Sequence, residues 1–305
     1  MGLTVTTAAA SRRLARLGHV KAELGIADTS QDALLRRQID DASAAIEAYC
    51  RRAFAREALT ETLAGWDATE LQLGRTPLVA VTSVLLDSEP VLDFSIESRD
   101  EAALYRRAGW AWTAQRSAGL TGRQRWPGFG APLPRSEEPR FSVSYVAGYI
   151  LPEQWLEDDT TVSVDAGDDS FNAAGKFPTL LQAGDVLVAS GFAQPANNGR
   201  FVVTGTPTSL KVQVSAALTT EAAGASATIR FDPPGECRGI ADLERACVQT
   251  VKRLYHGRAQ DPDVVEKQVG QLRIRRGESD TALTLPLPAE VVGLLRPWVR
   301  GARAA

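Results

Sequence analysis

Apolar residues recur at the helical period in two stretches near the start of the chain. In the first, from Ser11 to Gly25, spacings of three and four residues separate Leu14, Leu17, Val20 and Leu24. In the second, after Thr29 to Asp32, the same spacings separate Leu35, Ile39, Ala42, Ile46 and Tyr49. We expect a first helix that ends at a C-capping Gly25. A second helix should open with Thr29 and Asp32 at capping-box spacing and run to about Tyr49.

In the last quarter of the chain, apolar residues again recur at the helical period. From Ile240 to Tyr255, one face collects Leu243, Ala246, Cys247, Thr250, Val251 and Leu254. A shorter helix is expected from Pro288 to Trp298. These two segments bring the expected helices to four.

Between the two helical parts, the apolar period changes to two. Alternation predicts strands in Leu59–Leu63 and Leu71–Leu73. Pro77 begins a stronger strand, Leu78–Leu86, and alternation returns in Phe141–Val146. The stretch 105–140 between the last two of these strands is rich in Arg, Trp, Gly and Pro. We interpret it as a long loop with at most one hairpin, through Trp110 and Trp112.

Residues 157–232 differ from the rest of the chain. They show no helical period, and four basic residues stand against nine acidic ones. Short apolar strands are separated by turn residues at intervals of roughly ten, as in a small sandwich or barrel; they are Val186–Val188, Phe201–Val203, Leu210–Val214 and Ala227–Phe231. Asn197-Asn198-Gly199 is the strongest turn signal in the chain.

These patterns predict an α+β fold. A helical core with a small antiparallel sheet should form a discontinuous domain from residues 1–156 and 233–305. An all-β, sandwich-like or barrel-like module should be inserted between its two parts as residues 157–232. Insertions of this kind are tolerated at exposed loops, and the two ends of the module should lie close together.

Composition narrows the functional classes. The chain has 305 residues, 44% of them hydrophobic and 23% charged, which is typical of a globular protein. No apolar stretch is long enough to span a membrane, and the start of the chain lacks the pattern of a signal peptide. A net charge of −3 does not favour general nucleic-acid binding. Three cysteines without framework spacing argue against a disulfide scaffold.

No catalytic constellation emerges from the sequence. The chain has no CxxC or HxxxH spacing for a metal, no phosphate-binding glycine motif, and only two histidines. Cys247 falls on the apolar face of its helix, where a core role is expected. The acidic run from Asp165 to Asp169 lacks the closing glutamate of a calcium loop and is interpreted as a solvated turn. We therefore expect no enzyme activity, no metal and no cofactor.

The stretch 105–140 holds the most suggestive surface residues. Arginines and aromatic residues alternate there, as in single-stranded nucleic-acid sites and also in protein interfaces. We favour a subunit or partner interface over nucleic acid. Its candidate residues are Trp110, Trp112, Arg123, Arg125, Trp126 and Phe129.

Several stretches together resemble the head–tail connector (adaptor) proteins of tailed phages. The opening of that family is similar to Leu17–Ile26, Asp32–Leu35 and Ile39–Phe54. Its later strands resemble Leu73–Val84 and the Val-Ser-Tyr-Val-Ala-Gly-Tyr run of residues 143–149. Its third helix, the turn after it and its C-terminal end resemble Leu243–Val248, Tyr255–Arg258, Asp261–Gly270 and Pro288–Arg300.

The resemblance covers roughly residues 1–155 and 233–305, and it implies a structural role. Family members form a ring of about twelve copies, built by head-to-tail contacts that close by rotation. Such a ring sits on the portal protein in the neck of the virion and joins a downstream neck or tail protein. DNA passes through the lumen without sequence-specific binding. Assembly in the bacterial host cytoplasm is implied as well.

The chain departs from the family at residues 157–232, where family members have a short loop. This insert resembles a small β-domain of phage tail and other virion proteins, through Gly184–Phe192, Ala196–Val203 and Thr219–Gly224. We expect it on the outside of the ring, where it would contact the capsid or tail-side neighbours.

For portal docking, we expect the C-terminal tail to be used, with Trp298 as the anchor. The candidate residues are Leu294, Leu295, Arg296, Trp298 and Arg300, a composition typical of interface hot spots. The alternative is that Trp298 packs on its own domain. Two other functions stay open: a tail-tube or tail-completion subunit, and a DNA-binding protein that uses the loop 105–140.

Overall fold

The protein is represented by a computed structural model that describes residues 2–65, 68–111, 141–235, 239–257, 266–269, 272–275 and 287–299. The chain divides into two compact units. One, here called the sheet unit, comprises Met1–Ala9, Arg56–Ile150 and Leu156–Cys237. The other, the helical unit, comprises Ala10–Ala55, Leu151–Trp155 and Arg238–Ala305.

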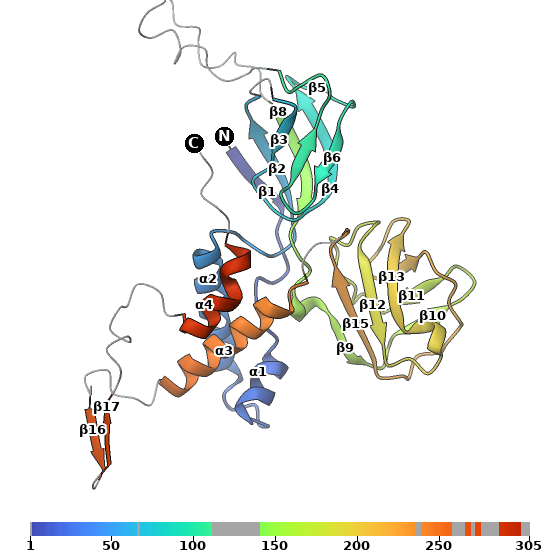
Figure 1. The fold of residues 1–305 in the computed structure, drawn as a ribbon. Helices are drawn as coiled ribbons and strands as arrows, with labels where there is room; N and C mark the ends of the chain where they lie inside the picture. The colour runs from blue at the N-terminus through green and yellow to red at the C-terminus, as the bar shows by residue number, and fades with distance from the viewer. Residues whose placement is uncertain are drawn as a thin grey trace, which may run out of the picture. The chain divides into compact units, whose positions relative to one another are not determined.

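The helical unit contains the predicted helices. They are α1 (Leu17–Leu24), α2 (Asp32–Cys50), α3 (Ala241–Gly257) and α4 (Ala289–Leu295), and a 3-10 turn, η6 (Arg296–Trp298), follows the last one. The longest two, α2 and α3, pack against each other, and α1 and α4 pack against α3 (Figure 1). A second 3-10 turn, η3 (Pro152–Gln154), and a two-stranded hairpin of β16 (Glu266–Val269) and β17 (Leu272–Arg275) complete the unit.

The predicted apolar stripe of α2 is confirmed. Leu35, Ile39, Ala42 and Ile46 are buried, while Tyr49 is half-buried. On α3, Leu243, Ala246, Cys247, Thr250 and Val251 are buried as expected, and Leu254 is half-buried. The spacing of three and four places these residues on one side of each helix, and the two sides meet in the core.

The predicted helix ends are only partly right. Gly25 caps α1 in the left-handed conformation, with φ of 68°. The predicted capping box at Thr29 is wrong, because α2 begins after Gln31 without a side-chain cap. The Asp28 carboxylate instead accepts hydrogen bonds from the backbone N–H and the hydroxyl of Ser30. The first helix also begins later than Ser11, since residues before Leu17 extend across α2, where the Leu14 N–H donates to Ser43 Oγ at 3.0 Å.

The first part of the sheet unit consists of two antiparallel sheets. One has the order β1-β2-β8-β4-β5, from strands Gly2–Thr7, Glu57–Leu63, Phe141–Ala147, Leu78–Leu86 and Glu89–Pro90. The other has the order β3-β7-β6, from Glu70–Gln72, Ala103–Tyr105 and Ser95–Ser98. A shared apolar core lies around Leu59, Leu104, Trp110, Phe141 and Tyr145.

The second part of the sheet unit is a seven-stranded antiparallel sheet within residues 156–232. Its order is β10-β11-β14-β13-β12-β15-β9, from strands Ser163–Asp165, Ser170–Asn172, Lys211–Val214, Gly199–Thr204, Val186–Ser190, Ala227–Asp232 and Leu156–Asp159. The strand that begins this stretch, β9, pairs with the strand that ends it, β15, with Leu156 opposite Ile229. The two ends of the stretch are therefore neighbours.

The predicted α+β class is confirmed, but the structure contains more strands than the sequence pattern predicted. Every strand predicted from alternation is present, but the segments before β12 contain strands that the pattern did not indicate, among them β1, β9, β10 and β11. The α-helices are confined to the helical unit and are four in number among the described residues, whereas a 3-10 turn, η4 (Pro195–Asn197), lies in the sheet unit.

Candidate interaction surfaces

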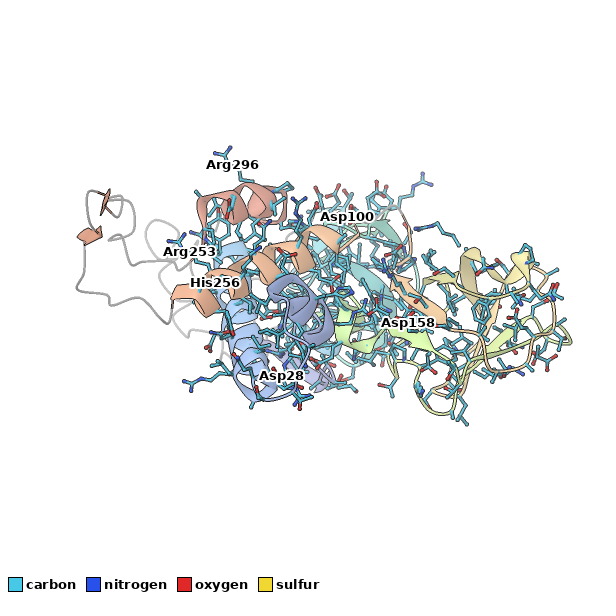
Figure 2. All side chains as sticks on the ribbon, turned by 90° about the horizontal axis from the view of Figure 1, so that it is seen from below. Asp28, Asp100, Asp158, Arg253, His256 and Arg296 are labelled. Carbon is cyan, nitrogen blue, oxygen red and sulfur yellow. The ribbon has the colours of Figure 1, made fainter. Side chains whose placement is uncertain are left out.

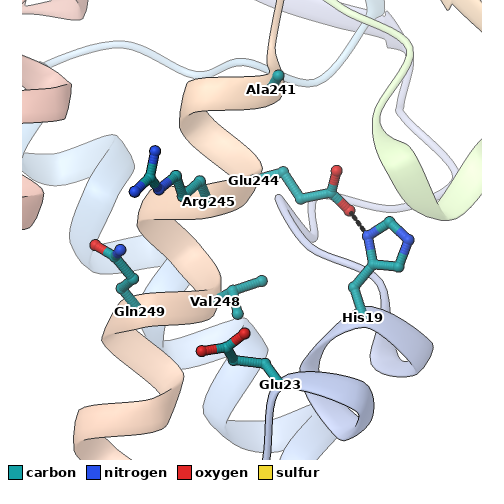
Figure 3. A pocket seen from close by; sticks show the side chains of 7 residues that line it. All are labelled: His19, Glu23, Ala241, Glu244, Arg245, Val248 and Gln249. Carbon is teal, nitrogen blue, oxygen red and sulfur yellow. Dashed lines mark hydrogen bonds and ion pairs between the residues drawn. The ribbon is translucent and has the colours of Figure 1, made fainter.

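A polar hollow lies between α1 and α3 in the helical unit (Figure 3). Its volume is about 400 Å³, and its lining consists of His19, Glu23, Ala241, Glu244, Arg245, Val248 and Gln249. The residues come from one side of α1 and one side of α3, so the packing of these two helices forms the hollow.

The charged groups of this hollow largely pair with each other or with their neighbours. His19 Nδ1 lies 2.7 Å from Glu244 Oε1. Lys252 Nζ donates to Glu23 Oε1 at 2.6 Å, and this contact lowers the pKa of the Glu23 carboxyl. These two contacts link α1 to α3 within the helical unit. Among the described residues, no group of three or more His, Cys, Asp and Glu side chains could hold a metal ion.

The C-terminal tail is anchored on its own unit. The Trp298 ring is 2% exposed and meets the Phe54 ring edge-to-face, with 5.7 Å between centroids. The Arg52 guanidinium lies 5.1 Å from the Phe54 ring and 6.0 Å from the Trp298 ring. Trp298 therefore packs on its own domain, which was the alternative to its role as a portal anchor.

The other tail residues differ in what they offer to a partner. Leu295 is fully buried, and Leu294 is half-buried. Arg296 is exposed, and its side chain projects away from the helical unit (Figure 2). Arg300 lies outside the described residues. Arg296 is thus the most accessible of the described candidates for docking.

Trp110 from the predicted interface loop belongs to the core of the sheet unit. Its side chain is fully buried, its ring meets Phe141 edge-to-face at 5.2 Å, and its Nε1 donates to the Thr69 carbonyl at 3.2 Å. The Trp110 side chain is therefore not accessible to a partner. The other candidates, Trp112, Arg123, Arg125, Trp126 and Phe129, lie outside the described residues.

A buried ion pair joins the two parts of the sheet unit. Arg56 Nη1 donates to Asp185 Oδ2 at 2.6 Å, and both side chains are at most 2% exposed. Arg56 lies just before β2, and Asp185 just before β12. Arg56 Nε also donates to the Gly148 carbonyl at 3.2 Å, while Asp185 Oδ2 accepts the Gln182 N–H at 2.7 Å. The sequence analysis missed this pair, and no local pattern could have indicated it because 129 positions separate its members.

The two cysteines among the described residues are free and buried in the helical unit. Burial raises the pKa of the Cys247 thiol to about 12 and that of the Cys50 thiol to about 11. Cys247 Sγ lies 3.7 Å from Ser43 Oγ, in the contact between α3 and α2. The predicted core role of Cys247 fits this position, since thiols with raised pKa values are poor nucleophiles.

A search for membrane-spanning helices found none of sufficient length and apolar character in the described part of the chain.

Comparison with known proteins points to one family. Residues 15–79 match the phage gp6-like head-tail connector proteins. This match spans α1, α2, β2, β3 and the start of β4, and it confirms the predicted resemblance for that stretch. No curated protein matches the chain.

Three solved structures contain chains that match part of this one, each at 20% sequence identity. They are the virion of a native gene transfer agent particle, the neck of the empty particle computed with C6 symmetry, and the neck of the native particle computed with C12 symmetry. Each match covers 50% of this chain and 76–77% of the other, with TM-scores of 0.33, 0.33 and 0.30.

Proposed function

The chain carries the sequence pattern of the phage gp6-like head-tail connectors in residues 15–79, and from this we propose that it is a structural adaptor in the neck of a tailed-phage virion. The adaptor joins the DNA-filled head to the tail by complementary surfaces, not by chemistry. The family match is the single observation that carries this proposal.

In this proposal, copies of the chain assemble head-to-tail into a closed ring of about twelve on the portal protein. The opposite side of the ring receives a downstream neck or tail protein, and DNA passes through the lumen without sequence-specific contacts. Assembly takes place in the bacterial cytoplasm.

We assign docking on the portal to the C-terminal tail, in which the buried and the exposed residues have different roles. Trp298 and Leu295 hold the tail to the helical unit, and Arg296 and the partly exposed Leu294 present themselves to the portal. A rigidly held tail loses little conformational entropy on binding, which favours affinity. Arg300, which follows this segment, is expected to add a further cationic contact.

The stretch 157–232 is proposed as an inserted module on the outside of the ring, in contact with capsid or tail-side proteins. Two observations support this proposal: the first strand of the stretch, β9, pairs with its last strand, β15, so that its two ends lie on neighbouring strands, and its residues carry an excess of acidic groups.

Mass measurement tests the ring. We expect native mass spectrometry of the purified chain mixed with its portal protein to show about twelve copies bound per portal. A chain that stays monomeric and never joins the portal would contradict the proposal.

Charge reversal tests the docking tail. Arg296→Glu should weaken capture of the chain by immobilised portal protein at least tenfold. The matched control is Arg107→Glu, the same change at an exposed arginine of the sheet unit, which should bind as the wild type does. Equal binding by both variants would remove Arg296 from the docking surface.

A further inference from the structure

The strand β1 (Gly2–Thr7) is attached to its sheet in an unusual way. It forms one edge of the five-stranded sheet, and all six of its residues are exposed. Leu3 and Val5 are 43% and 38% exposed. They are two positions apart and therefore point to the same side of the strand.

Among the described residues, β2 is the only strand that pairs with β1. Leu3 lies opposite Glu61, and Val5 opposite Leu59. No residue of β1 belongs to the apolar core of its sheets. Because strand pairs draw much of their stability from side-chain contacts, β1 gains little from its position in a single copy of the chain.

The two edges of the same sheet differ in the features that block pairing with another chain. The far edge, β5, is two residues long and consists of Glu89 and Pro90. A short strand, a charge and a proline are all devices that block pairing with another chain. The edge at β1 has none of them: its sequence Gly-Leu-Thr-Val-Thr-Thr is uncharged, free of proline and rich in strand-forming residues.

We propose that the open edge of β1, with Leu3 and Val5, is a contact surface for a second copy of this chain. The neighbouring copy covers the strand, pairs with its free backbone N–H and C=O groups, and buries the two apolar side chains. Strand addition of this kind takes its affinity from backbone hydrogen bonds and its specificity from alternate side chains.

The contact is head-to-tail, since a closed ring requires two different surfaces on every copy. If β1 paired with β1 of another copy, both open edges would be covered and assembly would stop at a dimer. An uncharged open edge on every copy would also cause aggregation unless assembly covers it. This inference rests on the ring proposed above, and its test separates the two.

The experiment compares two hydrophobic-to-lysine variants in the full chain. Val5→Lys places a charge on the open strand, whereas Leu92→Lys makes the same kind of change at the most exposed leucine among the described residues of the sheet unit, at 85%. Far-UV circular dichroism should show wild-type folding for both, since neither side chain is in the core. Native mass spectrometry, alone and with the portal, then gives the assembly state.

We expect Leu92→Lys to form the wild-type ring and Val5→Lys to lose at least nine-tenths of it. If the wild type forms rings and Val5→Lys forms them equally well, the strand is not the contact and this inference is wrong, while the ring stands. Equal loss in both variants, or a wild type that assembles only into dimers through β1, would overturn it too. A wild type that never assembles removes the proposed function itself.

Discussion

Trp298 illustrates how one residue can fix a segment that is used for binding. Its ring packs on Phe54 and is 2% exposed. We expect Trp298→Ala to lower the free energy of unfolding of the helical unit by about 3 kcal/mol, because a large buried ring is replaced by a cavity. Urea unfolding followed by circular dichroism at 222 nm measures this unit, since it holds all the described α-helices.

A matched control separates this anchoring from docking. Arg296→Ala, two positions away and exposed, should change the free energy of unfolding by less than about 0.5 kcal/mol, as surface substitutions usually do. If Trp298→Ala proved equally neutral, the ring would not be part of the core of the helical unit.

The buried thiols permit a prediction about pH. Burial raises the pKa of Cys247 to about 12 and that of Cys50 to about 11, above the ordinary value of 9.0. At pH 8 both therefore remain thiols, and the reactive thiolate is scarce. In a Cys237→Ser background, native protein should show no rapid reaction with Ellman's reagent at pH 8, and two thiols should react in urea.

The same shift makes the fold sensitive to alkali. A raised folded-state pKa stabilises the protein below the unfolded value, near 9, and this contribution is lost as pH rises toward the folded value. The unfolding midpoint should therefore fall between pH 9 and pH 11. A thiol that reacts at pH 8 as fast as free cysteine would contradict the burial of both residues.

At the scale of elements, the Arg56–Asp185 pair connects the start of β2 to the start of β12. Removal of one partner leaves a buried charge without compensation, which costs about 3–5 kcal/mol. We expect Asp185→Asn to increase hydrogen exchange in both β2 and β12, because the pair stabilises both strands. Exchange measured by mass spectrometry at peptide resolution checks this.

The double variant Arg56→Met with Asp185→Asn is the control for that prediction. With the buried cation removed as well, part of the lost protection should return. If exchange rises only in β12 and the second change restores nothing, the pair does not couple the two strands.

The elements differ in how far sequence alone could define them. The strand β2 and the buried stripe of α2 followed from apolar period, because in both elements one face is more deeply buried than the other. The strand β1 has no buried face at all, so its pattern carried no such signal. Trp110 was expected on a surface loop but is buried, because its ring partner Phe141 begins a strand some thirty positions later.

The interaction candidates were harder to predict than the fold. The period of the apolar residues indicates which side of an element faces the core. It does not indicate which exposed residues contact another chain. The period also does not predict which residues far apart in the sequence contact each other, so the Arg56–Asp185 pair was missed. The family resemblance was detectable because it depends on the order of many short runs, and the match over residues 15–79 confirms that part.

For the whole molecule, the question is whether ring formation needs the stretch 157–232. Its first and last strands are paired, with Ile229 opposite Leu156, so its two ends lie on neighbouring strands a few residues apart. A short glycine-serine linker can therefore replace residues 157–232 without stretching the flanking chain.

We expect the shortened chain to form the same number of copies per ring, because the family pattern and the open strand β1 both lie outside the deleted part. Arg56 should be changed to Met in this variant, since the deletion removes its partner Asp185. The full-length Arg56→Met chain is the matched control. Electron microscopy of rings on the portal should show density lost only at the periphery; loss in the lumen, or failure of the deleted chain alone to close a ring, would mean that the module is a part of the ring itself.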